Sequence, residues 1–289
     1  MIIAVASGKG GTGKTTIATS LALSLALNAS PPLLFLDCDV EAPNAHIFLR
    51  PDLTEKQSVD ILIPSVLESK CTLCARCSEV CQFNAIAVLG KKVVVFPQLC
   101  HGCGSCMLVC PEHAIKELAN NIGVIERGLT AEGILFARGV LNEGEPMPVP
   151  IIRKLKKWIP PQDNQISIID TSPGASCPVV AAVQDADFLI LVTEPTPFGL
   201  HDLCAAVQIS REMQIPAGVV INRENGDSLE LEGYCHHEDL PVLMRVPYER
   251  EIAEGIARGQ PLITIKSDYQ NQFISLFNQI VAALQLKNE

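Results

Sequence analysis

The stretch Gly8-Lys-Gly-Gly-Thr-Gly-Lys-Thr15 decides the fold that we expect of this sequence. It fits G-x-x-x-x-G-K-S/T, the pattern of a phosphate-binding loop. An apolar segment at residues 2–6 precedes the loop, and an apolar helical segment from Thr15 to about Leu27 follows it. The glycines allow backbone N–H groups to close around phosphates, and the helix N-terminus adds the positive end of its dipole. The sequence therefore predicts a nucleotide-binding β-α-β unit, completed by a strand at residues 33–37.

A dinucleotide fingerprint is the competing interpretation of this loop. Three of its glycines also satisfy G-x-G-x-x-G, and an acidic residue, Asp37, ends the following strand. Lys14 and Thr15 decide against it, because a pyrophosphate site needs neither a lysine nor a hydroxyl for Mg²⁺. We expect Lys14 to contact the β- and γ-phosphates of ATP or ADP, and Thr15 to bind Mg²⁺. The loop residues expected at the nucleotide are Gly8, Gly10, Gly11, Thr12, Gly13, Lys14, Thr15 and Thr16.

Further apolar segments extend this unit into a larger sheet. Residues 166–170, 188–193 and 217–222 read as buried strands that are separated by helical patterns. Buried strands that alternate with helices form mostly parallel sheets with helices on both faces. We therefore expect an α/β P-loop NTPase fold for most of the chain.

The middle of the chain contains an internal repeat of cysteines. The pattern C-x-x-C-x-x-C-x-x-x-C begins at Cys71 and again at Cys100. This is the spacing of bacterial ferredoxins with two clusters, in which the fourth cysteine of each run binds the other cluster. The predicted ligands are Cys71, Cys74, Cys77 and Cys110 for one [4Fe-4S] cluster, and Cys100, Cys103, Cys106 and Cys81 for the second. Zinc is the alternative for paired CxxC motifs, but eight cysteines in this repeat favour iron–sulfur clusters.

We expect the repeat to form a domain of its own inside the nucleotide domain. Residues 61–119 are predicted to be a small α+β bacterial-ferredoxin-like domain, and residues 1–60 and 120–289 the ATPase domain. The β/α alternation is expected to resume at Asn120. Two neighbouring clusters indicate an electron relay, because a purely structural role would need only one.

Composition narrows the class of protein further. The 289 residues carry a net charge of −10 and no long run of Lys or Arg, so we expect no nucleic-acid partner. No apolar run approaches the roughly 20 residues of a membrane span. Twelve cysteines without an export signal indicate metal or redox chemistry in a reducing compartment. We therefore expect a cytoplasmic protein that does not bind membranes.

The additional lysine, Lys9, makes the loop K-G-G-T-G-K-T-T, which resembles the deviant Walker A motif of the MinD/ParA/nitrogenase-iron-protein class. In that class the early lysine reaches the partner's nucleotide, so the resemblance implies an ATP-dependent homodimer with Lys9 and Lys14 as catalytic residues. Asp39 resembles the first switch and would activate the attacking water and help to hold Mg²⁺. Asp170 resembles the Walker B aspartate and would hold Mg²⁺ through water. The positions that match adenine contacts are Asn222, Arg223 and Pro247.

The leading functional hypothesis is an ATPase that gates electron transfer. Nucleotide-driven closure of the dimer would change how the two clusters dock on an unidentified redox partner. One alternative is an ATPase for iron–sulfur cluster assembly or delivery, resembling the Mrp type. Another is a MinD-like positioning ATPase. An amide-forming synthase, related by fold, has less support because no glutaminase domain is present.

The cysteines outside the repeat are expected to be structural. Cys204 lies in an apolar helical pattern and is expected in the core, whereas Cys38 and Cys177 flank the two switches and would lie near the dimer interface. Cys235 is expected in a polar loop. The apolar spacing of residues 273–284 predicts a core-packed final helix, because its polar face lacks the basic residues of a membrane anchor.

Overall fold

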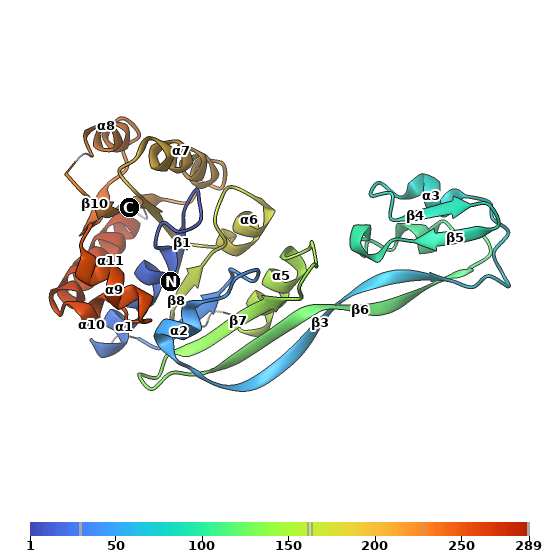
Figure 1. Cartoon of the computed structure of the whole chain (residues 1–289), viewed down its shortest axis with the longest axis horizontal. Coiled ribbons are helices and arrows are strands. Elements are labelled where there is room, and N and C mark those ends of the chain that lie inside the picture. Colours follow the sequence, from blue (N-terminus) through green and yellow to red (C-terminus); the bar gives the residue numbers. More distant parts are fainter. Residues whose placement is uncertain (29–30, 161, 163, 227, 288–289) are drawn as a thin grey trace.

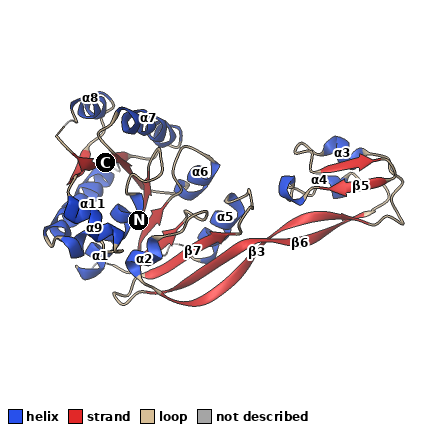
Figure 2. Cartoon of the chain, in the orientation of Figure 1, coloured by secondary structure: helices blue, strands red, loops and turns tan. Residues whose placement is uncertain are grey.

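The computed structural model describes residues 1–28, 31–160, 162, 164–226 and 228–287. One large sheet with its helices makes up most of the molecule, which we call the body (Figure 1). A small cysteine-rich part lies away from the body, at the end of two long strands. Figure 2 shows the same view with helices and strands in separate colours.

The elements divide between the body and the cysteine-rich part. The strands of the large sheet are β1 (Ile2–Ala6), β2 (Leu33–Asp37), β3 (Asp52–Val66), β6 (Ile115–Leu129), β7 (Leu135–Leu141), β8 (Ile166–Asp170), β9 (Phe188–Thr193), β10 (Ala217–Glu224) and β11 (Val242–Pro247). The helices of the body are α1 (Lys14–Leu27), α2 (Ala45–Leu49), α5 (Val149–Trp158), α6 (Cys177–Val183), α7 (Pro197–Glu212), α8 (Leu229–His237), α9 (Arg250–Ala257), α10 (Leu262–Ile265) and α11 (Asp268–Lys287). The cysteine-rich part contains α3 (Arg76–Val80), β4 (Ile86–Leu89), β5 (Lys92–Val95), the 3-10 helix η1 (Pro97–Leu99) and α4 (Ser105–Leu108).

Over the described residues, the large sheet has nine strands in the order β11-β10-β9-β1-β8-β2-β7-β6-β3. The strands from β11 to β7 are parallel, whereas β6 is antiparallel to β7, and β3 is antiparallel to β6. The mostly parallel α/β sheet predicted from the sequence is therefore confirmed. The expected return to β/α alternation at Asn120 is wrong, because β6 turns directly into β7 and the next helix begins only at Val149.

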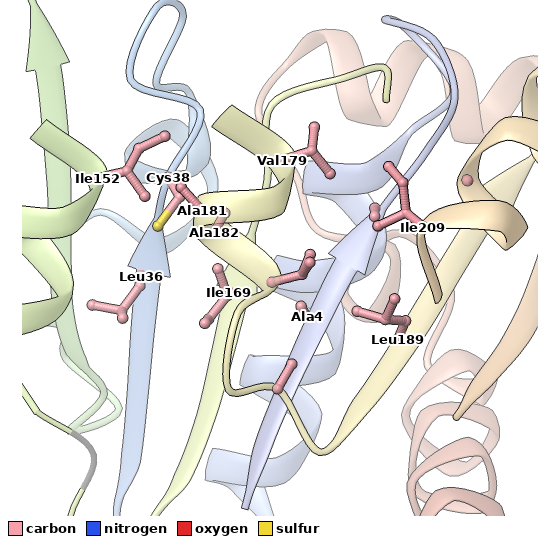
Figure 3. Packing of buried hydrophobic residues seen from close by; sticks show 14 of the residues in the cluster. Ala4, Leu36, Cys38, Ile152, Ile169, Val179, Ala181, Ala182, Leu189 and Ile209 are labelled. Carbon is pink, nitrogen blue, oxygen red and sulfur yellow. The ribbon is translucent and has the colours of Figure 1, made fainter. Parts of the chain in front are cut away.

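Each face of the sheet has its own core, because successive residues of a strand point to opposite faces. Ala4 of β1 packs with Leu36 and Ile169 of neighbouring strands under α5, α6 and α7 (Figure 3). Ile3 points the other way and packs with Phe35 under α1 and α11. These two cores fix the strands whose carboxyl ends carry the predicted nucleotide residues.

The final helix, α11, packs against α1 in the second of these cores. Phe273, Leu276 and Ile280 are fully buried, which confirms the core-packed helix predicted from the sequence. Among the residues that the structure describes, no helix is both long enough and apolar enough to cross a membrane.

Truncating the α11 anchor is expected to destabilise the body. Phe273 is 0% exposed, so Phe273→Ala leaves a cavity and should lower the free energy of unfolding by about 3–5 kcal/mol. Leu286→Ala is the matched control, because this side chain of the same helix is 75% exposed. Urea denaturation followed by circular dichroism measures both variants. Equal losses for the two would contradict the packing of α11.

Strands β3 and β6 form an antiparallel ribbon along their whole length. Strand β6 also pairs with β7, but only from Gly123 onward. The remaining pairs, residues 60–66 with 115–121, leave the sheet as a two-stranded arm (Figure 1). The arm carries the cysteine module, which we define as residues 67–114.

Charged pairs across the strands stabilise the root of the arm, which we define as residues 52–59 of β3 with residues 122–129 of β6. Glu55 contacts Arg127 at 2.7 Å, and Glu126 contacts both Lys56 at 3.1 Å and Arg138 at 2.7 Å. Cross-strand pairs of opposite charge contribute roughly 0.2–1 kcal/mol each. On β3 most side chains of the root face solvent, whereas Ile122 and Ile125 of β6 are fully buried, so both charged pairs and burial stabilise the root.

Candidate nucleotide site and cysteine module

The phosphate-binding loop leaves the carboxyl end of β1 and enters α1. Gly13 precedes α1 with a φ of 93°, in the left-handed region that favours glycine. A Cβ atom on Gly13 would lie 2.3 Å from Nδ2 of Asn222. That amide donates a hydrogen bond to the carbonyl oxygen of Thr12 at 2.7 Å. Glycine at this position thus allows β10 to close on the loop.

Carboxylates gather beside this loop, where β2 and β8 end. The Thr15 hydroxyl donates a hydrogen bond to Oδ2 of Asp170 at 2.6 Å. The other oxygen, Oδ1 of Asp170, is buried and has no hydrogen-bond partner in the described part of the chain. Mg²⁺ prefers carboxylate, hydroxyl and water oxygens. A free buried carboxylate oxygen beside a threonine hydroxyl fits a hydrated Mg²⁺ ion.

Asp37 holds the loop between β2 and α2, a role that the sequence did not reveal. It ends β2 and lies in register with Asp170 of β8. Its Oδ2 accepts a hydrogen bond from the N–H of Ala45 at 3.0 Å, and its Oδ1 accepts one from the N–H of Asp39 at 3.2 Å. Burial and the charge of Asp170 raise the pKa of Asp37 well above its usual range. Asp37 therefore holds the backbone of Asp39 and Ala45 beside Asp170.

The electrostatics of the site set its response to pH. Burial raises the pKa of Asp170 to about 7, against the opposing effects of the Thr15 hydroxyl and the Lys14 charge. Burial also raises the pKa of Asp39, and again Lys14 opposes the shift. In the folded, ligand-free chain Asp170 therefore keeps its proton at pH values where an unfolded chain has lost it. This group lowers the free energy of unfolding as pH rises from about 4 to about 7.

Binding of Mg-ADP is expected to strengthen as pH rises and to level off above about pH 7. The ion needs ionised Asp170, so binding below this pH must displace a proton from the carboxyl group. Calorimetry in two buffers with different ionisation enthalpies measures the released proton. Asp170→Asn should remove most of that release, and a smaller part should remain from Asp39, whose pKa is also raised. A release equal to that of the wild type would assign the titration to another group.

A cleft of about 1360 Å³, counting its open mouth, lies over the loop. The predicted nucleotide residues in its wall are Gly10, Gly11, Gly13, Lys14, Thr15, Thr16, Asp39, Asn222, Arg223 and Pro247. The predicted residues outside its wall are Gly8, Lys9, Thr12 and Asp170. The sequence analysis missed several wall residues, among them Asn44, Phe48, Pro173, Tyr248, Ile252 and Ile256. Ile252 and Ile256 are four residues apart and lie on one face of α9, and this spacing could have predicted an apolar wall from the sequence.

Lys9 is not among the residues of the cleft wall and pairs with Glu194 within its own chain. Its Nζ lies 3.5 Å from Oε2 of Glu194. The same glutamate accepts a hydrogen bond from Nη1 of Arg223 at 2.6 Å. Glu194 was not predicted as a site residue, and it connects two residues that were.

The eight cysteines of the repeat line two hollows in the cysteine module. The first hollow, of about 370 Å³ with its mouth, has in its wall Cys71, Cys74, Cys77 and Cys110. The second, of about 400 Å³ with its mouth, has in its wall Cys81, Cys100, Cys103 and Cys106. Each hollow thus brings three cysteines of one run together with the fourth cysteine of the other.

The backbone of the module repeats together with its sequence. Helices α3 and α4 are each preceded by a residue with left-handed φ, 64° and 73°. The N–H of Ala85 donates a hydrogen bond to Sγ of Cys81 at 3.3 Å, and the N–H of Ala114 donates one to Sγ of Cys110 at 3.3 Å. The fourth cysteine of each run therefore has the same backbone surroundings.

The cysteines outside the repeat differ from several expectations. Cys204 is exposed on α7, so its predicted core position is wrong. Cys38 is fully buried under α5 and α6, which excludes it from a dimer surface (Figure 3). Cys235 is buried in α8 and does not lie in a polar loop. Cys177 is exposed at the start of α6.

In the described ranges, no three His, Cys, Asp or Glu side chains lie close enough to share one metal ion.

The cleft over the loop, at the carboxyl edge of a mostly parallel sheet, defines a P-loop nucleotide-binding protein. The family model of the CobQ/CobB/MinD/ParA nucleotide binding domain matches residues 3–262. The chain therefore belongs to this family, and like its other members it is an ATPase.

Known proteins resemble the chain along most of its length. An uncharacterized protein of Methanocaldococcus jannaschii is 32% identical over 282 residues, which cover 97% of this chain and 98% of that protein. The iron-sulfur cluster carrier protein of Helicobacter pylori is 23% identical over 282 residues, which cover 91% of this chain and 61% of that protein. The septum site-determining protein MinD of Pyrococcus horikoshii, solved with Mg-ADP, has a TM-score of 0.59 at 19% identity, covering 96% of this chain and 95% of that one. This last likeness shows the fold.

Proposed function

We propose that this ATPase couples a nucleotide-driven change in a homodimer to electron transfer through two [4Fe-4S] clusters. The cysteine module would be a bacterial-ferredoxin-like domain inserted in the nucleotide domain, with an unidentified redox protein as its partner. Lys14, Thr15, Asp39 and Asp170 would hold and activate Mg-ATP. Lys9 would act on the nucleotide of the partner subunit.

The grouping of the cysteines around two hollows carries this proposal. Zinc sites in paired CxxC motifs take four ligands at one ion. Here each hollow combines three cysteines at the spacing C-x-x-C-x-x-C with the fourth cysteine of the other run, which is the arrangement of a two-cluster ferredoxin. Because each hollow takes its fourth cysteine from the other run, the two clusters would share one folded unit and lie close enough to exchange electrons.

Helix α2 supports a mechanical link between nucleotide and clusters. Asn44 and Phe48 line the cleft at either end of this helix. Strand β3 begins at Asp52, three residues after α2 ends at Leu49. A change in the first switch would therefore move the root of the arm. ATP would then control where the clusters point, and the chain would hold its clusters without help from the dimer.

Anaerobic EPR of the dithionite-reduced protein tests the proposal. We expect signals from two interacting [4Fe-4S] clusters and about eight iron atoms per chain. Adding Mg-ATP should change the signals, or the rate at which a soluble one-electron acceptor protein reoxidises the clusters, while Lys14→Ala should remove that change. Stoichiometric zinc without iron would refute the clusters. Clusters that respond in no way to ATP would refute the coupling.

Cluster delivery is a second candidate, favoured by the likeness to the Helicobacter pylori iron-sulfur cluster carrier protein. The exposure of Cys74 and Cys103 also favours it, because a delivered cluster needs access from outside. Incubation of the loaded protein with an apo-ferredoxin separates the two functions. Transfer of intact clusters that accelerates with ATP would replace electron transfer as the proposed activity.

A MinD-like positioning ATPase is the remaining alternative from the sequence. Such a protein would bind lipid vesicles in the presence of ATP. Most apolar side chains of α11 pack in the core, and the exposed Leu286 near its end does not form an apolar face for lipid. We therefore expect no ATP-dependent sedimentation with vesicles of anionic lipid, and sedimentation would favour the positioning function.

A further inference from the structure

Glu194 lies between two cationic residues of the candidate site. It follows β9 directly, and only 11% of its side chain is exposed. One carboxylate oxygen accepts a hydrogen bond from Arg223 at 2.6 Å, and the other lies 3.5 Å from Nζ of Lys9. A carboxylate that is this buried needs a cationic or hydrogen-bonding partner. Glu194 has two cations that share it.

The two pairs differ in how readily they can open. Arg223 contributes the short pair, and its backbone has a left-handed φ of 55°, which non-glycine residues rarely adopt. Such a conformation persists where the surroundings determine it. Lys9 contributes the longer pair, at 3.5 Å against 2.6 Å, from a loop between two glycines. Lys9 can leave while Arg223 stays, so the buried carboxylate would keep one partner.

We propose that Glu194 is a positioning residue that holds Lys9 against its own chain until ATP-dependent dimerisation draws Lys9 to the partner's nucleotide. This inference rests on the homodimer proposed above. We call the pair of Glu194 with Lys9 the latch. The latch is reversible, because the buried carboxylate of Glu194 still pairs with Arg223 after Lys9 has left. The carboxylate also connects the latch to the cleft, since Arg223 lies in the cleft wall, where a bound nucleotide would contact it.

Removal of the charge of Glu194 is expected to release Lys9 and to favour the dimer. Glu194→Gln keeps the size of the side chain and one acceptor for Arg223, but it no longer attracts Lys9. Sedimentation velocity across an ATP titration should show half-maximal dimer at an ATP concentration lower by roughly threefold to tenfold. Some dimer should also form with ADP, where the wild type stays monomeric.

Glu126→Gln is the matched control. Glu126 is 14% exposed and is likewise shared by a lysine and an arginine, Lys56 and Arg138, but it lies at the root of the arm. This variant should dimerise as the wild type does. If Glu194→Gln does not fold, Glu194→Asp draws the carboxylate back by one methylene and should shift the titration in the same direction.

The outcomes separate the latch from the function on which it rests. A wild type that stays monomeric at saturating ATP would refute the proposed homodimer, and with it the latch. A wild type that dimerises, together with a Glu194→Gln variant that titrates like Glu126→Gln, would refute the latch alone. A shift confined to the Glu194 variants would support it.

Discussion

Removal of iron is expected to unfold the cysteine module and to leave the body folded. The buried apolar cluster that holds the module comprises Cys77 and Ile86 of the module and Ile115 of β6, with a few half-buried neighbours. So small a core cannot offset the backbone entropy of a segment of this length, roughly 1–2 kcal/mol for each residue. All three of these residues line the two hollows, so binding of the proposed clusters would be coupled to folding.

Hydrogen exchange with anaerobic holoprotein and chelated protein measures this effect by segment. Amides of residues 67–114 should lose nearly all protection on iron removal, whereas amides of β1 and β8 should keep theirs. Cys110→Ser should lose iron and the same protection. Cys204→Ser is the matched control, because this exposed cysteine lies on α7 in the body and should leave the iron content unchanged. Full protection of residues 67–114 without iron would contradict the prediction.

The body could be predicted from the sequence because its signals are local. The phosphate loop and the buried strands each lie within a short stretch, as does the cysteine spacing of the module. The first half of β3 gave no such signal: most side chains from Asp52 to Asp60 face solvent, so they show no alternating apolar pattern. Its partner strand begins about fifty residues later, at Ile115, and only the folded chain shows that the two strands pair.

At the candidate site, too, the sequence predicted what a local motif determines and missed contacts between residues far apart in the chain. Lys14 and Thr15 lie where their motif implies, whereas the pairing of Lys9 with Glu194 joins residues far apart in the sequence. Cys204 was misplaced for a different reason. Its apolar neighbours suggested burial, but Leu203 and Val207, four apart, form the buried face of α7 and leave Cys204 on the other side.

Loss of Lys14 is expected to abolish tight ATP binding, whereas loss of Lys9 should leave it nearly intact. Lys14 is 6% exposed in the cleft wall and opposes the effects of burial on Asp39 and Asp170. In Lys14→Ala the polyphosphate meets these carboxylates without that cation. A lost contact of this kind costs about 3–4 kcal/mol at an effective dielectric of about 20. The affinity for Mg-ATP should therefore fall on the order of 100-fold to 1000-fold.

Lys9→Ala provides the contrast, because this side chain lies outside the cleft wall and pairs with Glu194. With a fluorescent ATP analogue, at protein concentrations too low for dimers, Lys9→Ala should bind within about threefold of the wild type. Turnover measured at high protein concentration should be lost in both variants, since Lys9 would act on the partner's nucleotide. Equal losses of affinity would place Lys9 in the cleft of its own chain. Normal turnover by Lys9→Ala would remove the reason for a dimer, and the cluster module would then have to respond to ATP within a single chain, through α2 and the arm.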